Sequence, residues 1–461
     1  MGRPRQLKNS VGRTGGVQRD SVIDLVRFLC LALVVLGHSM MVSPVLHGDG
    51  TVTTENTLME QPWIVPLTWI LMVMPLFFVL GGVTGLESWR RLKDGGGTGF
   101  DYAKLRLLRL IRPAAALLAV MFVGLWMARL VGVDPQVIQL MTTGAGMPLW
   151  FLAAYLGAQL SVPLMARMHG HAPWLTLGIL LACIITVDSL RGLLPMLAFI
   201  NLIFVWCAIQ QLGFFLADGL FAGRSRIWLL GVIAGSNLLL GVVTGVAVYP
   251  GDMLTNLNPP NLCLVLLGIS QTATLQLLRP AVAWVAGVRW IHWVVSVVGH
   301  RPMTIYLWHL PLLVAMTGLL LLTDFPKPAS GTAEWWLARP LVFLAVVVLL
   351  VPVLALFGRL EDRPTAAVHA RGRPPAAVVA AGVAVFIPVV DAVFNGLTLE
   401  LLGGGAACFG LAVLLLGHVP ASVPAQVPAP PPASPRAAVP APAAGPAEPL
   451  PAPGLSANLD S

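Results

Sequence analysis

Apolar segments alternate with short polar segments along most of the chain, from Val22 to Leu416. Their lengths are typical of membrane-spanning helices, since a helix needs about 20 mostly apolar residues to cross a hydrocarbon core about 30 Å thick. We predict ten spans near residues 22–42, 64–86, 113–132, 149–166, 174–187, 195–217, 228–248, 261–278, 303–322 and 338–357. Two weaker spans follow near 376–392 and 398–416. The pattern therefore predicts an all-α, polytopic transmembrane helical bundle of about twelve spans.

One further apolar stretch, from Val282 to Val298, has a different pattern. Its tryptophans alternate with polar side chains, among them Arg289 and His292. Tryptophan and basic residues at this spacing are typical of an amphipathic helix that lies in the membrane interface. We therefore expect this stretch to lie on the membrane surface rather than to cross it.

The distribution of basic residues supports this count of spans. Lysine and arginine gather in cytoplasmic loops of membrane proteins. With twelve spans and a cytoplasmic N-terminus, the predicted external loops hold four of the 28 basic residues, namely Arg129, Arg191, Lys327 and Arg339. A thirteenth span at 282–298 would place four more outside, Arg359, Arg363, Arg371 and Arg373. The sequence thus predicts a multi-pass protein of the plasma membrane with both termini in the cytoplasm.

Composition agrees with a membrane protein. The chain is 57% hydrophobic and 10% charged with a mean hydropathy of +0.83, whereas soluble domains are about 45–50% apolar and about 25% charged. The net charge of +8 does not indicate a nucleic-acid partner, because its basic residues sort by membrane side rather than along a soluble face. The five cysteines all lie in apolar segments, so neither a disulfide framework nor a metal site is predicted.

The two ends of the chain differ from the apolar middle. Residues 1–19 are basic and are predicted to be disordered, and residues 420–461 form a Pro/Ala-rich tail without aromatic residues that is predicted to be disordered as well. Between them we expect one membrane domain at 20–361 and two additional transmembrane helices within 376–416.

Three ionisable residues, Asp24, Arg27 and His38, lie in the first predicted span. Such residues cost about 2.5–3.5 kcal/mol each inside a membrane, so they mark functional sites by default; they also argue against a cleavable signal peptide. The eleven-residue step from Arg27 to His38 returns to nearly the same helix face, about 16 Å further along the axis. This polar stripe is predicted to face the bundle interior. In the alternative interpretation, Asp24 and Arg27 merely pair at the membrane boundary while His38 binds a carbonyl.

A second constellation precedes Pro113, where Arg106 and Arg109 lie three residues apart. Arginines at this spacing share one side of a helix, and guanidinium groups bind phosphate bidentately. The alternative is a cluster that fixes topology and meets lipid headgroups.

From about Arg19 to Glu361 the sequence resembles the acyltransferase 3 family of integral membrane acyltransferases. The resemblance rests on the spacing from Arg27 to His38, on the stretch Phe77-Phe78-Val-Leu-Gly-Gly, on Arg106-x-x-Arg109 before Pro113, and on two further motifs. These are Leu149-Trp150-Phe151-Leu152 in the fourth span and Thr304-Ile-Tyr306-Leu-Trp308-His309 in the ninth.

The resemblance implies a cytoplasmic acyl-CoA donor substrate, a hydroxyl acceptor and a catalytic histidine, here His38. A neutral imidazole can take a proton from a hydroxyl as that hydroxyl attacks a thioester. Arg106 and Arg109 would bind the phosphates of coenzyme A, and Arg27 would hold the donor or stabilise developing negative charge.

Three residues have possible supporting roles, namely Asp24, Tyr306 and His309. His309 could provide a second proton relay, or it could simply pack at an aromatic helix end.

The expected acceptor is a hydroxyl on a glycan, a lipid-linked sugar or a secondary metabolite. Two departures from the family pattern leave its identity open: many members have serine where this chain has Gly81, and a glutamate pair where Tyr155 and Leu156 stand. The alternative function is a proton-coupled transporter or exporter in which Asp24, Arg27 and His38 form a relay.

Overall fold

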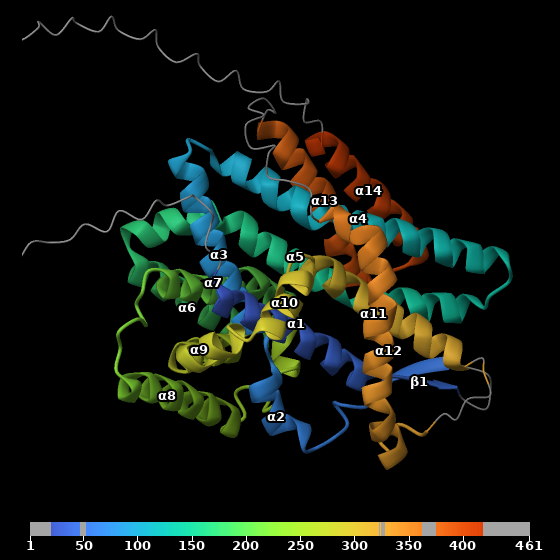
Figure 1. The fold of residues 1–461 in the computed structure, drawn as a ribbon, viewed down its shortest axis with the longest axis horizontal. Helices are drawn as coiled ribbons and strands as arrows, with labels where there is room; N and C mark the ends of the chain where they lie inside the picture. Colours follow the sequence, from blue (N-terminus) through green and yellow to red (C-terminus); the bar gives the residue numbers. More distant parts are fainter. Residues whose placement is uncertain (1–19, 47–51, 322, 324–327, 362–374, 418–461) are drawn as a thin grey trace, which may run out of the picture. The chain divides into compact units, whose positions relative to one another are not determined.

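The structure, a computed structural model, describes residues 20–46, 52–321, 323, 328–361 and 375–417, and nearly all of them are helical (Figure 1). Within these residues, twelve helical segments are long and apolar enough to cross a membrane, which confirms the predicted polytopic bundle. The predicted disordered segments at 1–19 and 420–461 lie outside the described residues.

The spanning segments are formed by α1 (Ser21–Met41), α2 (Ile64–Leu71) with α3 (Met74–Asp94), α4 (Gly99–Leu130), α5 (Pro135–His171), α6 (Pro173–Leu190), the 3-10 helix η1 (Pro195–Ile200) with α7 (Asn201–Ala217), α8 (Arg226–Gly245), α9 (Leu262–Ala286), α11 (Pro302–Leu321), α12 (Ala333–Phe357) with η3 (Gly358–Leu360), α13 (Pro375–Asn395) and α14 (Leu399–Gly417).

Two helices begin well before the apolar segments that predicted them. α4 begins at Gly99 instead of residue 113, because Thr98 and Asp101 form a reciprocal capping box that satisfies the first free backbone N–H groups. α5 begins at Pro135 instead of residue 149, and the side chain of Asp134 caps it. The early start of α4 places Arg106 and Arg109 inside a regular helix.

The second span is broken between α2 and α3. The break lies at Met72 and Val73, just before Pro75 in the first turn of α3. A broken helix inside a membrane leaves backbone groups that other elements must satisfy, and here the Gln271 side-chain amide of α9 donates to the Met72 carbonyl at 2.7 Å. The break gives the chain an irregular turn inside the bundle.

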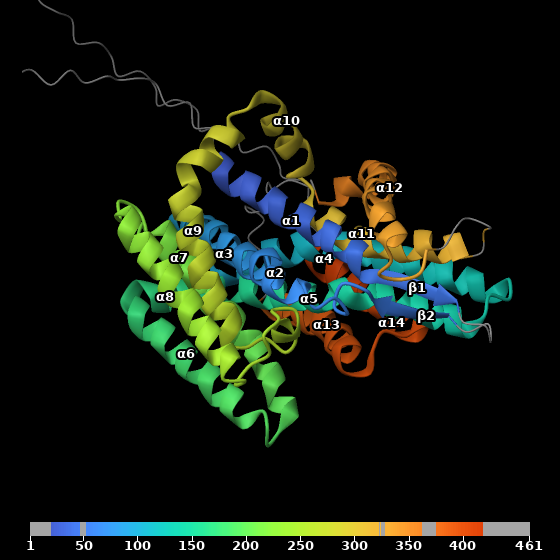
Figure 2. The same ribbon diagram turned by 90° about the horizontal axis from the view of Figure 1, so that it is seen from below.

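The amphipathic stretch forms the short helix α10 (Arg289–Val298), which is too short to cross a membrane. Trp290 and Trp293 are exposed on one side, while Val295 is buried on the other and packs with Leu25 of α1. Figure 2 shows α10 next to the beginning of α1, and α10 also contacts α9. The prediction that this stretch does not form a span is therefore confirmed, except that residues 282–286 continue α9.

A small hairpin follows α1 and was not predicted. β1 (Val42–Leu46) pairs antiparallel with β2 (Val52–Asn56), and β1 packs against α11. The indole N–H of Trp335 at the start of α12 donates to the Ser43 hydroxyl at 3.1 Å. The hairpin thus ties the end of α1 that follows His38 to α11 and α12.

A close crossing of α3 and α7 explains one glycine of the Phe77-Phe78-Val-Leu-Gly-Gly stretch. A Cβ atom on Gly82 of α3 would lie 2.3 Å from the Gln210 carbonyl oxygen of α7, and one on Gly213 of α7 would lie 2.2 Å from the Val79 carbonyl oxygen. Small residues allow such backbone approach between membrane helices. Gly82 is therefore required for packing.

Candidate active site

The polar stripe of α1 faces neighbouring helices along its length. Near the start of the helix, the Arg27 guanidinium lies 3.5 Å from the Asp24 carboxylate. It also donates to the Thr84 hydroxyl of α3 at 3.4 Å, and its side chain is only 19% exposed. Arg27 therefore pairs with Asp24, as one sequence interpretation expected, and also reaches into the bundle.

At the other end of the stripe, His38 meets His309 of α11. Nδ1 of His38 lies 2.7 Å from Nε2 of His309, and the ring planes are within 15° of parallel. The ring centroids are 5.0 Å apart. This separation is about the sum of the nitrogen–nitrogen distance and the radii of the two rings. The two rings therefore meet edge to edge in one plane, as an N–H···N hydrogen bond requires.

The surroundings of His309 determine which nitrogen carries each proton. Nδ1 of His309 lies 3.2 Å from the Ile305 carbonyl oxygen, which can only accept. In the neutral ring that nitrogen is therefore the donor, and Nε2 accepts. His38 must then donate from Nδ1, which leaves the lone pair on its Nε2 for a proton from elsewhere. His309 is buried with no measurable exposure, so its position is set by packing.

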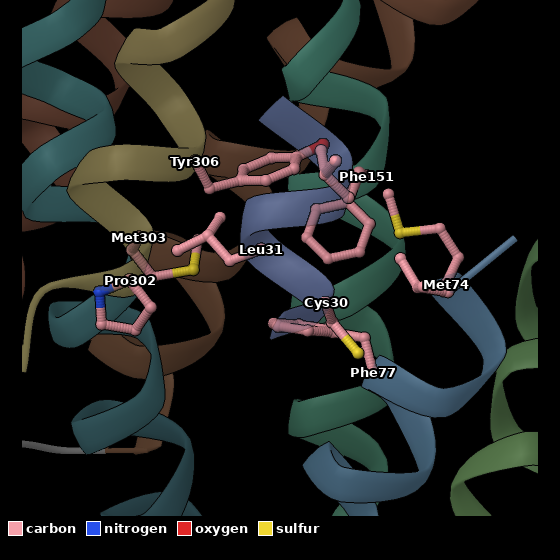
Figure 3. A pocket seen from close by; sticks show the side chains of 10 residues that line it. Cys30, Leu31, Met74, Phe77, Phe151, Pro302, Met303 and Tyr306 are labelled. Carbon is pink, nitrogen blue, oxygen red and sulfur yellow. The ribbon is translucent and has the colours of Figure 1, made fainter. Parts of the chain in front are cut away.

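A narrow apolar pocket lies between the two ends of the stripe. Cys30, Leu31 and Val34 of α1 line it, and these positions fall between Arg27 and His38. Figure 3 shows Tyr306 and Phe151 on another wall, with Met74 and Met303 beside them. Val73 at the break between α2 and α3 also lines the pocket, so the irregular turn in the second span shapes it.

Tyr306 joins the pocket to the histidine pair. Its ring centroid lies 4.5 Å from that of Phe151 and 5.7 Å from that of His309. Because Tyr306 and His309 are three residues apart on α11, they share one side of the helix. Tyr306 therefore contacts both a wall of the pocket and the histidine pair.

Near the Arg27 end of the stripe, charges gather from three segments, namely α1, α4 and the residue that follows η3. Arg109 of α4 is exposed although its neighbours Leu108 and Leu110 are buried, and it interacts electrostatically with Arg27 and with Glu361. Arg106 also interacts with Arg109, but its guanidinium packs over the Tyr102 ring at 4.9 Å.

Glu361 is a member of this cluster that the sequence did not reveal. Its carboxylate accepts from the backbone N–H groups of Met303 and Thr304 at 3.2 and 3.0 Å, and from the Thr304 hydroxyl at 3.0 Å. These groups open α11, so Glu361 caps the helix that carries Tyr306 and His309. Burial raises the pKa of Glu361, while Arg109 opposes that shift. No local motif marks such a cap, because the two segments are 57 residues apart.

A model of the acyltransferase domain of this family matches residues 20–359. The chain belongs to the acyltransferase 3 family. The match begins immediately before α1 and ends within η3, so it contains all the residues of the stripe, the pocket and the arginine pair, whereas α13 and α14 follow it. No curated protein and no solved structure matches the chain significantly. The protein is thus a multi-pass membrane acyltransferase.

Within this acyltransferase, the two departures from the family pattern touch each other. A Cβ atom on Gly81 would lie 3.0 Å from a ring carbon of Tyr155. That ring packs against Phe77 and Phe151, which line the pocket, with centroids 5.4 and 5.7 Å apart. The tyrosine therefore occupies the space beside Gly81 into which a serine side chain would project, so the two departures are structurally coupled.

The predicted site residues of the acyltransferase thus form two groups, and the residues of α1 between them line the apolar pocket. His38, His309 and Tyr306 lie at one end, and Arg27, Asp24, Arg109 and Arg106 lie toward the other. Among the described residues, no group of three or more His, Cys, Asp or Glu side chains could hold a metal ion.

Proposed function

We propose that this acyltransferase moves an acyl group, such as acetyl, from cytoplasmic acyl-CoA to a hydroxyl of a glycan, a lipid-linked sugar or a secondary metabolite. The observation that carries the proposal is the order of groups along α1. Arg27 with Arg109, the apolar pocket and the histidine pair follow one another over about 16 Å of helix, at 1.5 Å per residue. A phosphorylated carrier with a thin, mostly apolar arm that ends in a thioester matches this order.

The arginine end suits the phosphates of the donor. Guanidinium groups form charge-assisted, bidentate hydrogen bonds with phosphate oxygens. Arg109 is accessible and close to Arg27, while Arg106 adds a further positive charge. The predicted cytoplasmic N-terminus places this end toward the cytoplasm, where acyl-CoA is made.

The pocket suits the pantetheine arm of coenzyme A. It is narrow, and Met74 and Met303 are among its walls. Unbranched methionine side chains change rotamer readily, so these two can make way for the arm without movement of the helices. The thioester then lies near His38 and Tyr306.

The histidine pair supplies a general base. As the acceptor oxygen attacks the thioester carbonyl carbon, its proton moves to Nε2 of His38, and a C–O bond forms. The C–S bond then breaks, and the departing thiolate takes the proton back from the imidazolium. His309, which accepts from Nδ1–H of His38, fixes the tautomer and stabilises the transient imidazolium. The Tyr306 hydroxyl is suited to donate to the carbonyl oxygen as it becomes negative.

The test uses purified protein in detergent, where no gradient can drive transport. Labelled acetyl-CoA is supplied with a panel of hydroxylated acceptors, and products are separated by mass. We expect covalent acetylation of at least one acceptor together with release of free coenzyme A. A protein that instead moves a solute across sealed vesicles in a proton-dependent manner, and acetylates nothing, would be a transporter.

A further inference from the structure

A second cavity lies next to the arginine end of the pocket. It is enclosed by the first turns of α1, the end of α9 and the surface helix α10, and its lining residues are Ser21, Asp24, Leu25, Ala286, His292, Val295, Ser296 and Gly299. Nothing in the proposed reaction uses this space. It is wider than the pocket that leads to His38.

The lining combines apolar walls with a few polar groups. Leu25, Ala286 and Val295 are buried and pack together as one cluster. Asp24, whose carboxylate also pairs with Arg27, and His292 are the ionisable residues of the lining. Apolar walls with few convergent polar groups are the usual construction of small-molecule sites. A flat heteroaromatic ring that carries an amino group fits this lining, because its faces are apolar and its amino group can donate to a carboxylate.

The residues that line the cavity and the narrow pocket are near neighbours along two segments of the chain. On α1, Asp24 and Leu25 line the cavity while Cys30 and Leu31 line the pocket, and Arg27 lies between the two pairs. On the other side, Gly299 lines the cavity while Pro302 and Met303 line the pocket. From Asp24 to His38 the helix rises about 21 Å, a length that suits an extended carrier molecule.

We propose that the cavity between α1 and α10 binds the adenine base of the acyl-CoA donor, with the Asp24 carboxylate accepting from the amino group of the base. The proposal rests on the proposed function. In this proposal α10 forms one wall of the donor site. A lipid headgroup phosphate is a less favourable occupant than adenine, because the Asp24 carboxylate repels its negative charge.

The experiment compares two donors that differ only in the base. Acetyl-CoA and acetyl-1,N6-ethenocoenzyme A have the same thioester and phosphates, but the etheno bridge enlarges the base and removes its amino group. The measured quantity is the ratio of kcat/KM for the two donors. We expect the unsubstituted protein to favour acetyl-CoA by about tenfold or more, as the loss of a hydrogen bond to a charged group predicts.

Two variants fill the cavity from opposite walls, namely Ser296→Trp on α10 and Ser21→Trp on α1. In both, the base no longer enters, so the ratio should fall toward one. Val297→Trp is the matched control, because Val297 lies on the same helix and is 54% exposed; its ratio should equal that of the unsubstituted protein. If one filling variant does not fold, the proposal is still tested by the kcat/KM ratio of the other variant and by that of the unsubstituted protein.

Two results would overturn the proposal. One is a ratio near one in the unsubstituted protein, and the other is a ratio that both filling variants leave unchanged. Transfer from neither donor would instead refute the proposed function, so the two failures are distinguishable.

Discussion

Replacing His309 tests whether the histidine pair works as a unit. In His309→Ala, the Nδ1–H of His38 loses its acceptor at 2.7 Å, and the imidazole is free to adopt the other tautomer or to turn. The reacting nitrogen is then no longer held toward the substrate. The substitution should therefore impair the chemical step rather than donor binding.

The magnitude follows from the lost hydrogen bond. A buried polar group left without its partner costs about 1–3 kcal/mol, which corresponds to a decrease of about 5- to 150-fold in kcat. His309→Gln provides the matched comparison, because the end of its side chain reaches about as far as Nε2 and offers a carbonyl oxygen as acceptor. We expect His309→Gln to recover a large part of the activity.

The assay follows release of free coenzyme A from acetyl-CoA in the presence of a hydroxyl acceptor that the unsubstituted protein acetylates. KM for acetyl-CoA should change little, while kcat should fall in the order unsubstituted, His309→Gln, His309→Ala. The reasoning is refuted if His309→Ala keeps full kcat, or if a folded His309→Gln protein is as impaired as His309→Ala.

Substitutions at four further positions test the rest of the site. Gly81→Ser should lower thermal stability in detergent, since overpacking costs about 1–3 kcal/mol. Adding Tyr155→Leu should recover part of this loss. If the effects of the two substitutions on stability are additive, residues 81 and 155 do not interact as proposed. Glu361→Ala should lower stability by about 1–3 kcal/mol, because the first N–H groups of α11 lose their acceptor, whereas Glu361→Gln should lose less; equal losses would show that the hydrogen bonds are unimportant. Arg109→Gln should raise KM for acetyl-CoA about tenfold or more and leave kcat/KM for acetyl-pantetheine, which lacks the diphosphate, nearly unchanged; an equal loss with both donors would argue against phosphate binding.

The sequence was most informative where a property repeats over many residues. Twelve spans were predictable because apolar segments of spanning length alternate with short polar segments. The surface helix α10 was predictable because exposed tryptophans alternate with polar groups. The beginnings of α4 and α5 were not predicted from hydropathy, because capping by Thr98 and Asp134 fixes them.

The candidate site was predicted in its parts but not in its assembly. Helix periodicity placed Asp24, Arg27 and His38 on one face of α1. The contact between His38 and His309 joins residues 271 positions apart, and the Glu361 cap on α11 spans 57. Such contacts depend on how helices cross, which no local pattern in one sequence specifies.

The two helices that follow the family match remain part of the bundle. α14 packs against α4, and α13 packs against α5. A Cβ atom on Gly403 of α14 would lie 2.8 Å from the Phe122 ring of α4, so these helices fit closely. They thus pack against the two helices that carry Arg109 and Phe151.

The central claim is that His38 performs the chemistry at the end of a donor path that is built from other residues. The most direct test measures acetyl-CoA binding and acetyl transfer separately in His38→Ala. We predict that binding, followed by equilibrium titration, changes by no more than about twofold, while single-turnover transfer falls at least about a hundredfold, the range expected for removal of a general base. A His38→Ala protein that binds acetyl-CoA and transfers the acetyl group at the unsubstituted rate would contradict the claim.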